Sequence, residues 1–153
     1  MSGNFAAEVS AWVQETQQRM DAVFKESCQR TIAKAQTPVG AGGYMPIDTG
    51  FLRASVRAST SAMPPIDSAA KPTLPMYAYN SGEVVLTIAS AEFGQTIYVG
   101  WTANYAAHIH NGTSRMIPRP FATMAALQWE SIVHQVGSEA MARALQSSGP
   151  ARP

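Results

Sequence analysis

The chain has 153 residues, of which 46% are hydrophobic, and a formal net charge of +1 at pH 7 from eleven Lys and Arg against ten Asp and Glu. This length fits one domain over residues 1–153 that buries about two-thirds of its unfolded surface. The near balance of charge argues against a dedicated nucleic-acid binder, because such proteins neutralise phosphates with an excess of basic residues.

The first predicted element is a long helix over residues 4–35. Apolar residues recur there every three or four positions, and no Pro or Gly interrupts the segment. Charged residues occupy the opposite face, where Glu26 and Arg30 form a favourable i,i+4 pair. Pro38 and the glycines that follow it then end the helix. The apolar stripe comprises Phe5, Val9, Trp12, Val13, Met20, Val23, Phe24 and Ile32.

The stretch 46–56 allows two interpretations. In the first, the Asp48 carboxylate caps a short helix by accepting from backbone N–H groups two and three residues on. In the second, a strand begins near Leu52, because apolar and polar residues alternate from there to Ser59. A capped turn that runs into a strand near Val56 combines the two, and we prefer it. Replacing Asp48 by Ala is then expected to lower the free energy of unfolding by about 1 kcal/mol.

The middle of the chain is predicted to hold a loop and a β-hairpin. Residues 61–80 contain four prolines among small polar residues, which predicts a long, irregular and mobile loop. The apolar runs 84–88 and 96–101 resemble two strands, and Gly94 lies in their connection. We therefore expect these two runs to pair with each other.

The stretch 105–121 is the most constrained part of the sequence. A single helical turn is expected over 105–110, with Asn104 as its cap and Gly112 at its end. Pro120 suits the first position of a helix, where no N–H is needed. A corner of this kind is expected to position either a core side chain or a contact surface.

A second long helix is predicted over 120–145, and the tail 146–153 is expected to be disordered. Two long helices packed on a small antiparallel sheet, with a long Pro-rich loop, make an α+β domain. The apolar face of the second helix comprises Phe121, Met124, Ala125, Leu127, Ile132, Val133, Val136, Met141 and Leu145, with Trp129 at its edge.

No catalytic, cofactor-binding or metal-ligating constellation is predicted. The triplet that begins at Asp48 also occurs in retropepsin-type aspartic proteases, but it follows a long helix and no flap hairpin comes after it. His108 and His110 point apart on a single helical turn, and Cys28 is the single cysteine, so a metal site is not expected. The first residues lack the features of a signal peptide, and no apolar run has the length of a membrane span. We therefore expect a soluble protein made in the cytosol, without membrane contact.

Two stretches of the sequence together resemble the tail-component family of long-tailed bacteriophages, which contains neck and tail-completion proteins comparable in role to the lambda minor tail protein Z. No single motif is specific, and their order and spacing make the resemblance. The matching positions are Asp48-Thr49-Gly50, Leu52, Ser55-Val56, Val99-Gly100, Tyr105-Ala106, Gly112-Thr113, Arg119-Pro120-Phe121 and Ala125.

The resemblance implies a structural virion protein without a catalytic site, which joins head and tail at the neck. Its implied partners are other neck and tail proteins and further copies of itself in a ring, with transient contact to DNA in the lumen. It is expected in the virion, and in the host cytoplasm during assembly. An assembly chaperone that does not remain in the virion, or another soluble binding module, is the alternative, and an aspartic protease is a distant third.

The resemblance also implies roles for the matching residues. Asp48, Thr49 and Gly50 fix the turn after the first helix, next to Leu52 and Arg53. The corner before the last helix is held by Tyr105, Gly112, Thr113, Arg119, Pro120 and Phe121. The family often has an acid before the Gly-Thr pair, where this chain has His110-Asn111. Four arginines near these stretches are expected to contact acids of a neighbouring ring rather than DNA, namely Arg53, Arg57, Arg115 and Arg119.

Overall fold

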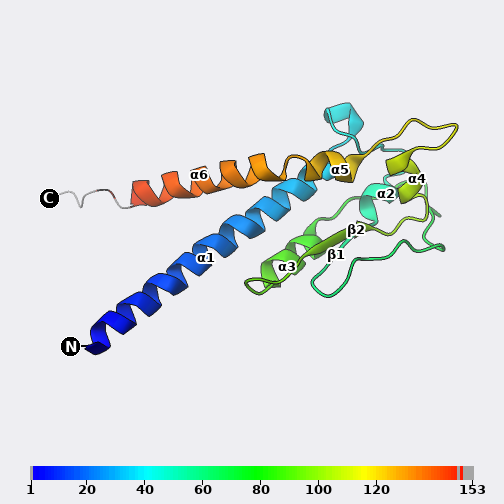
Figure 1. Ribbon diagram of the computed structural model, residues 1–153. Coiled ribbons are helices and arrows are strands. Elements are labelled where there is room, and N and C mark those ends of the chain that lie inside the picture. The colour runs from blue at the N-terminus through cyan, green and yellow to red at the C-terminus, as the bar shows by residue number, and fades with distance from the viewer. Residues whose placement is uncertain (1, 148, 150–153) are drawn as a thin grey trace.

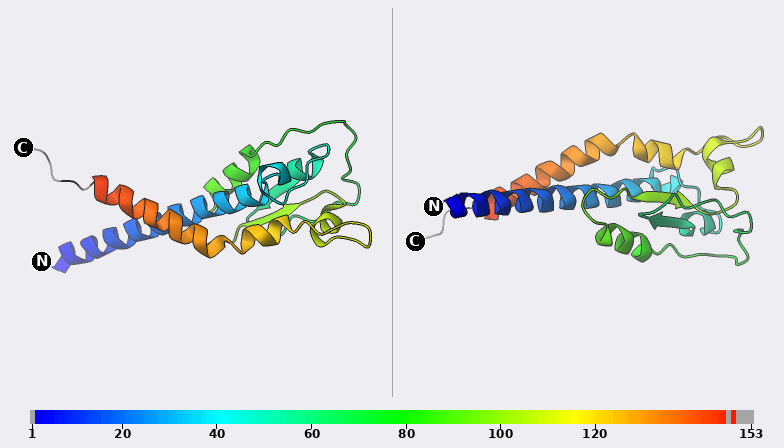
Figure 2. Two further views of the ribbon diagram at one scale, coloured as in Figure 1. Left: turned by 90° about the horizontal axis from the view of Figure 1, so that it is seen from above. Right: turned by 60° about the horizontal axis from the view of Figure 1, so that its bottom comes forward.

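The computed structural model describes residues 2–147 and 149 and confirms the α+β fold. Two long helices, α1 (Ser2–Ala35) and α6 (Trp129–Ser147), pack against each other, and a small antiparallel sheet with several short helices gathers around the C-terminal half of α1 (Figure 1). The N-terminal half of α1 projects away from this body. The two long helices cross and then diverge toward the two ends of the chain (Figure 2).

The sheet has two strands, β1 (Val56–Ser59) and β2 (Tyr98–Trp101), paired antiparallel with Val56 opposite Trp101. A single helical turn, α2 (Phe51–Ala54), leads directly into β1. The combination of a turn and a strand beginning near Val56 is therefore confirmed. The expected strand over 96–101 is also present, in its last four residues.

The prediction of a strand over 84–88 is wrong, because this run lies inside the helix α3 (Gly82–Ser90). A strand would place Val84, Leu86 and Ile88 on one face, whereas the structure buries Val84 and Ile88 and leaves Leu86 exposed. That spacing of four is helical. The buried pair packs with Ile32 and Val56, so tertiary packing overrides the strand preference of this β-branched run.

The core consists of two neighbouring clusters, which Trp101 of β2 joins because its ring packs against both. The first cluster lies beside α2 and the second lies between α1, α3 and the sheet. The first contains Met45, Leu52, Ala103, Ala106 and Phe121, and the second contains Ile32, Val56, Val84 and Ile88.

The loop 61–80 is irregular, as predicted, but backbone hydrogen bonds attach it to the body. Asp67 N donates to Thr102 O at 2.9 Å and Tyr77 N donates to Thr49 O at 2.8 Å. Asn104 N donates to the carbonyl oxygen of Ala70 at 2.9 Å. The loop therefore lies along the sheet and the turn before α2.

The predicted helix over 120–145 is present as two helices, α5 (Phe121–Ala126) and α6, separated by a turn at Leu127 and Gln128. No Gly or Pro causes the break. In the turn Gln128 N donates to the carbonyl oxygen three residues earlier, which tightens the chain before α6 begins. The expected disordered tail is wrong for Gln146 and Ser147, which belong to α6. Residues 148 and 150–153 lie outside the described residues.

Candidate interaction surface

The structure brings the two stretches of the resemblance together in one place. Leu52 from the first stretch and Phe121 from the second are buried in the same cluster. The ring of Phe51 lies 6.3 Å from that of Tyr105, which is only partly buried. Leu52 and Phe121 therefore act first as part of the core that joins α2 to the corner before α5, whereas Asp48, Thr113 and Arg119 are exposed.

The corner 105–121 is built largely from backbone contacts. The helix α4 (Ala106–Asn111) lacks the predicted cap by Asn104, since Tyr105 occupies the N-cap position without a side-chain hydrogen bond. Gly112 ends α4 as predicted, with φ of 76°, and a Cβ there would lie 2.8 Å from Met116 O. Thr113 N donates to the same carbonyl oxygen at 3.0 Å. Two further corner residues follow: Arg119, whose N donates to Ile109 O at 2.9 Å, and Pro120, which is the N-cap of α5 and not its first residue.

The predicted capping role of Asp48 is wrong. The N-cap of α2 is Gly50, no side chain caps this helix, and the exposed Asp48 carboxylate accepts no hydrogen bond from the described residues. Instead, the Thr49 hydroxyl accepts a hydrogen bond from Phe51 N at 3.3 Å. Thr49 and Gly50 thus shape the turn without help from the acid.

Replacing Asp48 by Ala is therefore expected to change the free energy of unfolding by less than about 0.5 kcal/mol, the usual range for an exposed side chain without a structural partner. Urea denaturation of the two proteins at neutral pH measures the difference. A loss of about 1 kcal/mol would show that this carboxylate does cap the turn in solution.

Arg53 belongs to a part-buried polar network that ties Gln36, the residue just after α1, to α2 and β2. The buried Gln36 accepts a hydrogen bond from Trp101 Nε1 at 3.0 Å and donates to Arg53 O at 2.8 Å. In return Arg53 Nε donates to Gln36 O at 3.0 Å, and its guanidinium lies 4.8 Å from the centre of the Tyr79 ring. Arg53, which is partly exposed, therefore holds α2 to the segment just after α1.

The four arginines divide into two pairs. Arg57, like Arg53, is engaged within the chain, because its Nη1 donates to Val56 O at 2.7 Å. Arg115 and Arg119 are exposed, and neither side chain forms an ion pair within the described part of the chain. Arg57 is exposed as well, but its side chain also lies 4.0 Å from Glu83, so Arg115 and Arg119 are the two of the four that are exposed without an ion pair in the described residues.

Several large apolar side chains are exposed elsewhere, on the projecting half of α1. Every side chain from residue 4 to residue 15 is exposed, and we call this segment the arm. Trp12 is 67% exposed and Phe5 is 72% exposed, although both belong to the predicted apolar stripe. The spacing of the apolar residues predicted the stripe. It did not predict that the N-terminal part of the stripe is exposed to solvent, with no other element packed on it.

A groove of about 600 Å³ lies between α1 and α6, next to the arm. Two aromatic residues in its lining, Phe24 and Trp129, meet edge to face with ring centres 6.0 Å apart. Its lining is apolar apart from Arg19. It is formed by Arg19, Met20, Val23, Phe24, Trp129, Val133, Gly137, Ala140, Met141 and Ala144.

Gly137 lies inside α6, and no neighbouring group within the chain requires a residue without a side chain at this position. A Cβ built at this position meets nothing within 4 Å. A glycine inside a helix costs about 0.5–1 kcal/mol relative to alanine. The space above Gly137 is thus open toward the groove, so that another backbone or ring can approach α6 closely there.

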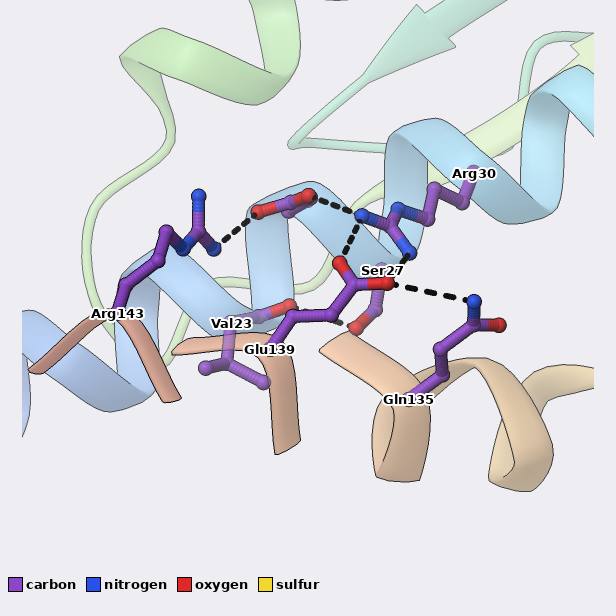
Figure 3. Close-up of polar contacts among 7 residues, drawn as sticks. Val23, Ser27, Arg30, Gln135, Glu139 and Arg143 are labelled. Carbon is purple, nitrogen blue, oxygen red and sulfur yellow. Dashed lines mark hydrogen bonds and ion pairs between the residues drawn. The ribbon is translucent and has the colours of Figure 1, made fainter. Parts of the chain in front are cut away.

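Charged residues hold α6 against α1 at their crossing (Figure 3), and we call this group the clasp. Arg30 reaches Glu139 of α6 at 2.5 and 3.2 Å and Glu26 of its own helix at 2.6 Å, as the i,i+4 spacing predicts for the second pair. Arg143 of α6 lies 3.5 Å from Glu26. These ion pairs are partly exposed, so they orient the two helices more than they stabilise the fold.

The clasp is expected to weaken in acid. The Arg30 guanidinium lowers the pKa of Glu139, so the stabilisation from this carboxylate is complete above the unfolded pKa of about 4.3 and is lost as pH falls through the lower folded pKa. The difference in unfolding free energy between the native protein and Glu139→Gln should therefore shrink between pH 7 and about pH 3. Urea denaturation at both pH values measures it. An unchanged difference would mean that the Glu139 charge contributes nothing to stability.

Two other kinds of site are not found in the described residues. Within 2–147 and 149, no three His, Cys, Asp or Glu side chains are grouped as a metal site requires. His110 instead contacts Thr123 Oγ1 at 3.1 Å and the Phe121 ring, and His108 is exposed. No described helix combines the length and the apolar composition that crossing a membrane demands.

The whole chain exposes 10487 Å², whereas a compact monomer of 16.4 kDa exposes about 7,500 Å². The surplus of about 3,000 Å² exceeds the roughly 800 Å² that each partner buries in an interface of standard size. The arm and α6 extend away from the body of the molecule (Figure 1), and every side chain of the arm is exposed. The surface is therefore large enough for contacts with more than one partner.

Comparison with models of known protein families, with curated protein sequences and with solved structures gives no match to this chain.

Proposed function

We propose that this protein is a structural component of the neck of a long-tailed bacteriophage, where it joins the head to the completed tail. The observation that carries the proposal is the uncovered apolar surface of the arm and the groove, which favours a protein that works through contacts with other proteins. The order of motifs that resembles the tail-component family then selects the neck among assemblies of this kind. In this role the protein has no catalytic site and acts as a ring of identical copies.

Two residues are proposed to face the neighbouring neck or tail proteins. Arg115 and Arg119 lie exposed at the corner and are free of intramolecular ion pairs in the described chain. Because the net charge is only +1, we assign them to acids on an adjacent ring and expect contact with DNA in the lumen to be transient. The protein then belongs in the virion, and in the host cytoplasm before assembly.

Infection by a phage that lacks this protein is expected to yield filled heads and separate tails of near-normal length. Heads and tails are built on separate pathways, so the loss of a joint spares both. Electron microscopy of the lysate measures this, and adding the purified protein should restore joined particles. Lysates without capsids, or with unpackaged ones, would place the protein at an earlier step and overturn the neck assignment.

The assembly chaperone is the second candidate, and the same uncovered apolar surface is what favours it, since a chaperone also binds through such a surface. Mass spectrometry of purified virions separates the two, because a neck protein remains in mature particles and a chaperone does not. An aspartic protease is a distant third candidate. It would show pepstatin-sensitive peptide cleavage that Asp48→Ala abolishes.

A further inference from the structure

We propose that the arm of one copy binds in the groove of the next copy, so that identical chains join head to tail. The arm and the groove are different surfaces of the same chain, and each is apolar and uncovered. A contact between two different surfaces is heterologous, and it generates a ring when successive copies close. The pairing of arm and groove rests on the proposed function only in the assumption that successive copies close into a ring.

The shape of the two surfaces supports this pairing. Phe5, Val9 and Trp12 follow one another at intervals of four and three residues, so they form one ridge on the exposed side of α1. The α1 side of the groove follows the arm directly along the helix. On the α6 side, the empty space above Gly137 can accommodate the side chains of such a ridge. An amphipathic helix that lays its apolar face in such a groove is a common mode of recognition.

Charge favours the groove over a second arm as the partner. The arm carries Glu8 and Glu15 and no basic residue, and the charged residue that lines the groove is Arg19, which lies 3.9 Å from Glu15 of its own chain. Both side chains of this pair are highly exposed, so the pair itself contributes little. Two arms packed on each other would bring the Glu8 carboxylates of both copies together without a base on either arm, whereas an arm in the groove places its Glu8 near Arg19. The surface surplus of the chain is also large enough for each copy to give an arm and receive one.

The test uses two single variants that damage opposite surfaces. Trp12→Glu places a charge on the arm and Met141→Glu places one in the groove, and both side chains are 67% exposed, so folding is expected to be unaffected. Gly137→Leu is a second groove variant, which fills the empty space without adding charge. Leu86→Glu on α3 is the matched control, since that leucine is 69% exposed and lies outside both surfaces.

Light scattering of the purified full chain, over a range of concentrations, is expected to show that the native protein and Leu86→Glu assemble. Trp12→Glu, Met141→Glu and Gly137→Leu should each lose assembly and give the mass of one chain, 16.4 kDa for the native sequence. An equal mixture of Trp12→Glu and Met141→Glu should then form a pair of twice that mass and grow no further. The first variant supplies an intact groove and the second an intact arm, so one contact forms in each pair.

Three outcomes would overturn the inference. The native chain stays monomeric, or the arm and groove variants assemble as well as Leu86→Glu does, or the mixture of the two variants stays monomeric. Assembly of Met141→Glu by itself, with loss of assembly in Trp12→Glu, would also overturn it, because that pattern would show that arms bind arms. The lysate of a phage lacking the protein is an independent result, so filled heads with free tails would leave the neck assignment standing even if this pairing fails.

Discussion

Replacing Phe121 by Ala is expected to lower the free energy of unfolding by about 3–5 kcal/mol. The Phe121 ring is 3% exposed and lies in the cluster that holds α2, the corner and α5 together. It meets the Trp101 ring edge to face at 4.8 Å and the His110 ring at 5.4 Å. Alanine removes these contacts and leaves a cavity between elements that other bonds hold in place. Urea denaturation measures the loss as a lower midpoint at an unchanged slope.

The control for this prediction is Phe93→Ala, which makes the same chemical change at a ring that is 51% exposed. That substitution should cost well under half as much, because the ring keeps much of its contact with water in the folded state. Equal losses for the two variants would mean that the Phe121 ring is not packed in solution as the structure has it.

The burial of Phe121 was predictable because its role depends on residues close to it in sequence. Pro120 fixes where α5 begins, and the apolar spacing after it fixes which face turns inward. The same local reasoning gave α1 and the turn into β1. It failed at Val84–Ile88, where a strand pattern and a helical pattern share the same apolar residues and only the neighbours Ile32 and Val56 decide between them.

The candidate surface was less predictable than the fold. Trp12 and Ile32 occupy one apolar stripe, yet the first is exposed and the second is buried. Ile32 is covered because Val56 of β1 and Val84 and Ile88 of α3 pack against it, and these residues are distant in sequence. The path of α6 depends on the turn at Leu127 and Gln128, where the sequence has no Gly or Pro to signal a break. The solitary glycine inside α6, Gly137, was the available signal for the groove.

Replacing Gly50 by Ala is expected to destabilise the fold by about 2–5 kcal/mol, the sum of two separate costs. The backbone of Gly50 has φ of 83°, a left-handed conformation that costs other residues about 1–2 kcal/mol. A Cβ would also lie 2.5 Å from Tyr77 O, which is backbone and cannot turn aside. The carbonyl is held there because Tyr77 N donates to Thr49 O at 2.8 Å, so the clash must shift either the turn or the loop, at about 1–3 kcal/mol.

Gly42→Ala separates these two costs. Gly42 has φ of 87°, nearly the same as Gly50, but a Cβ there meets nothing within 4 Å. It should therefore cost only the conformational part, about 1–2 kcal/mol. The gap between the two variants, measured by urea denaturation, is then the cost of pushing the loop 61–80 away from the turn before α2. Equal losses in the free energy of unfolding for the two variants would mean that the loop moves away at little cost. The three backbone hydrogen bonds that attach the loop would then contribute little to stability in solution.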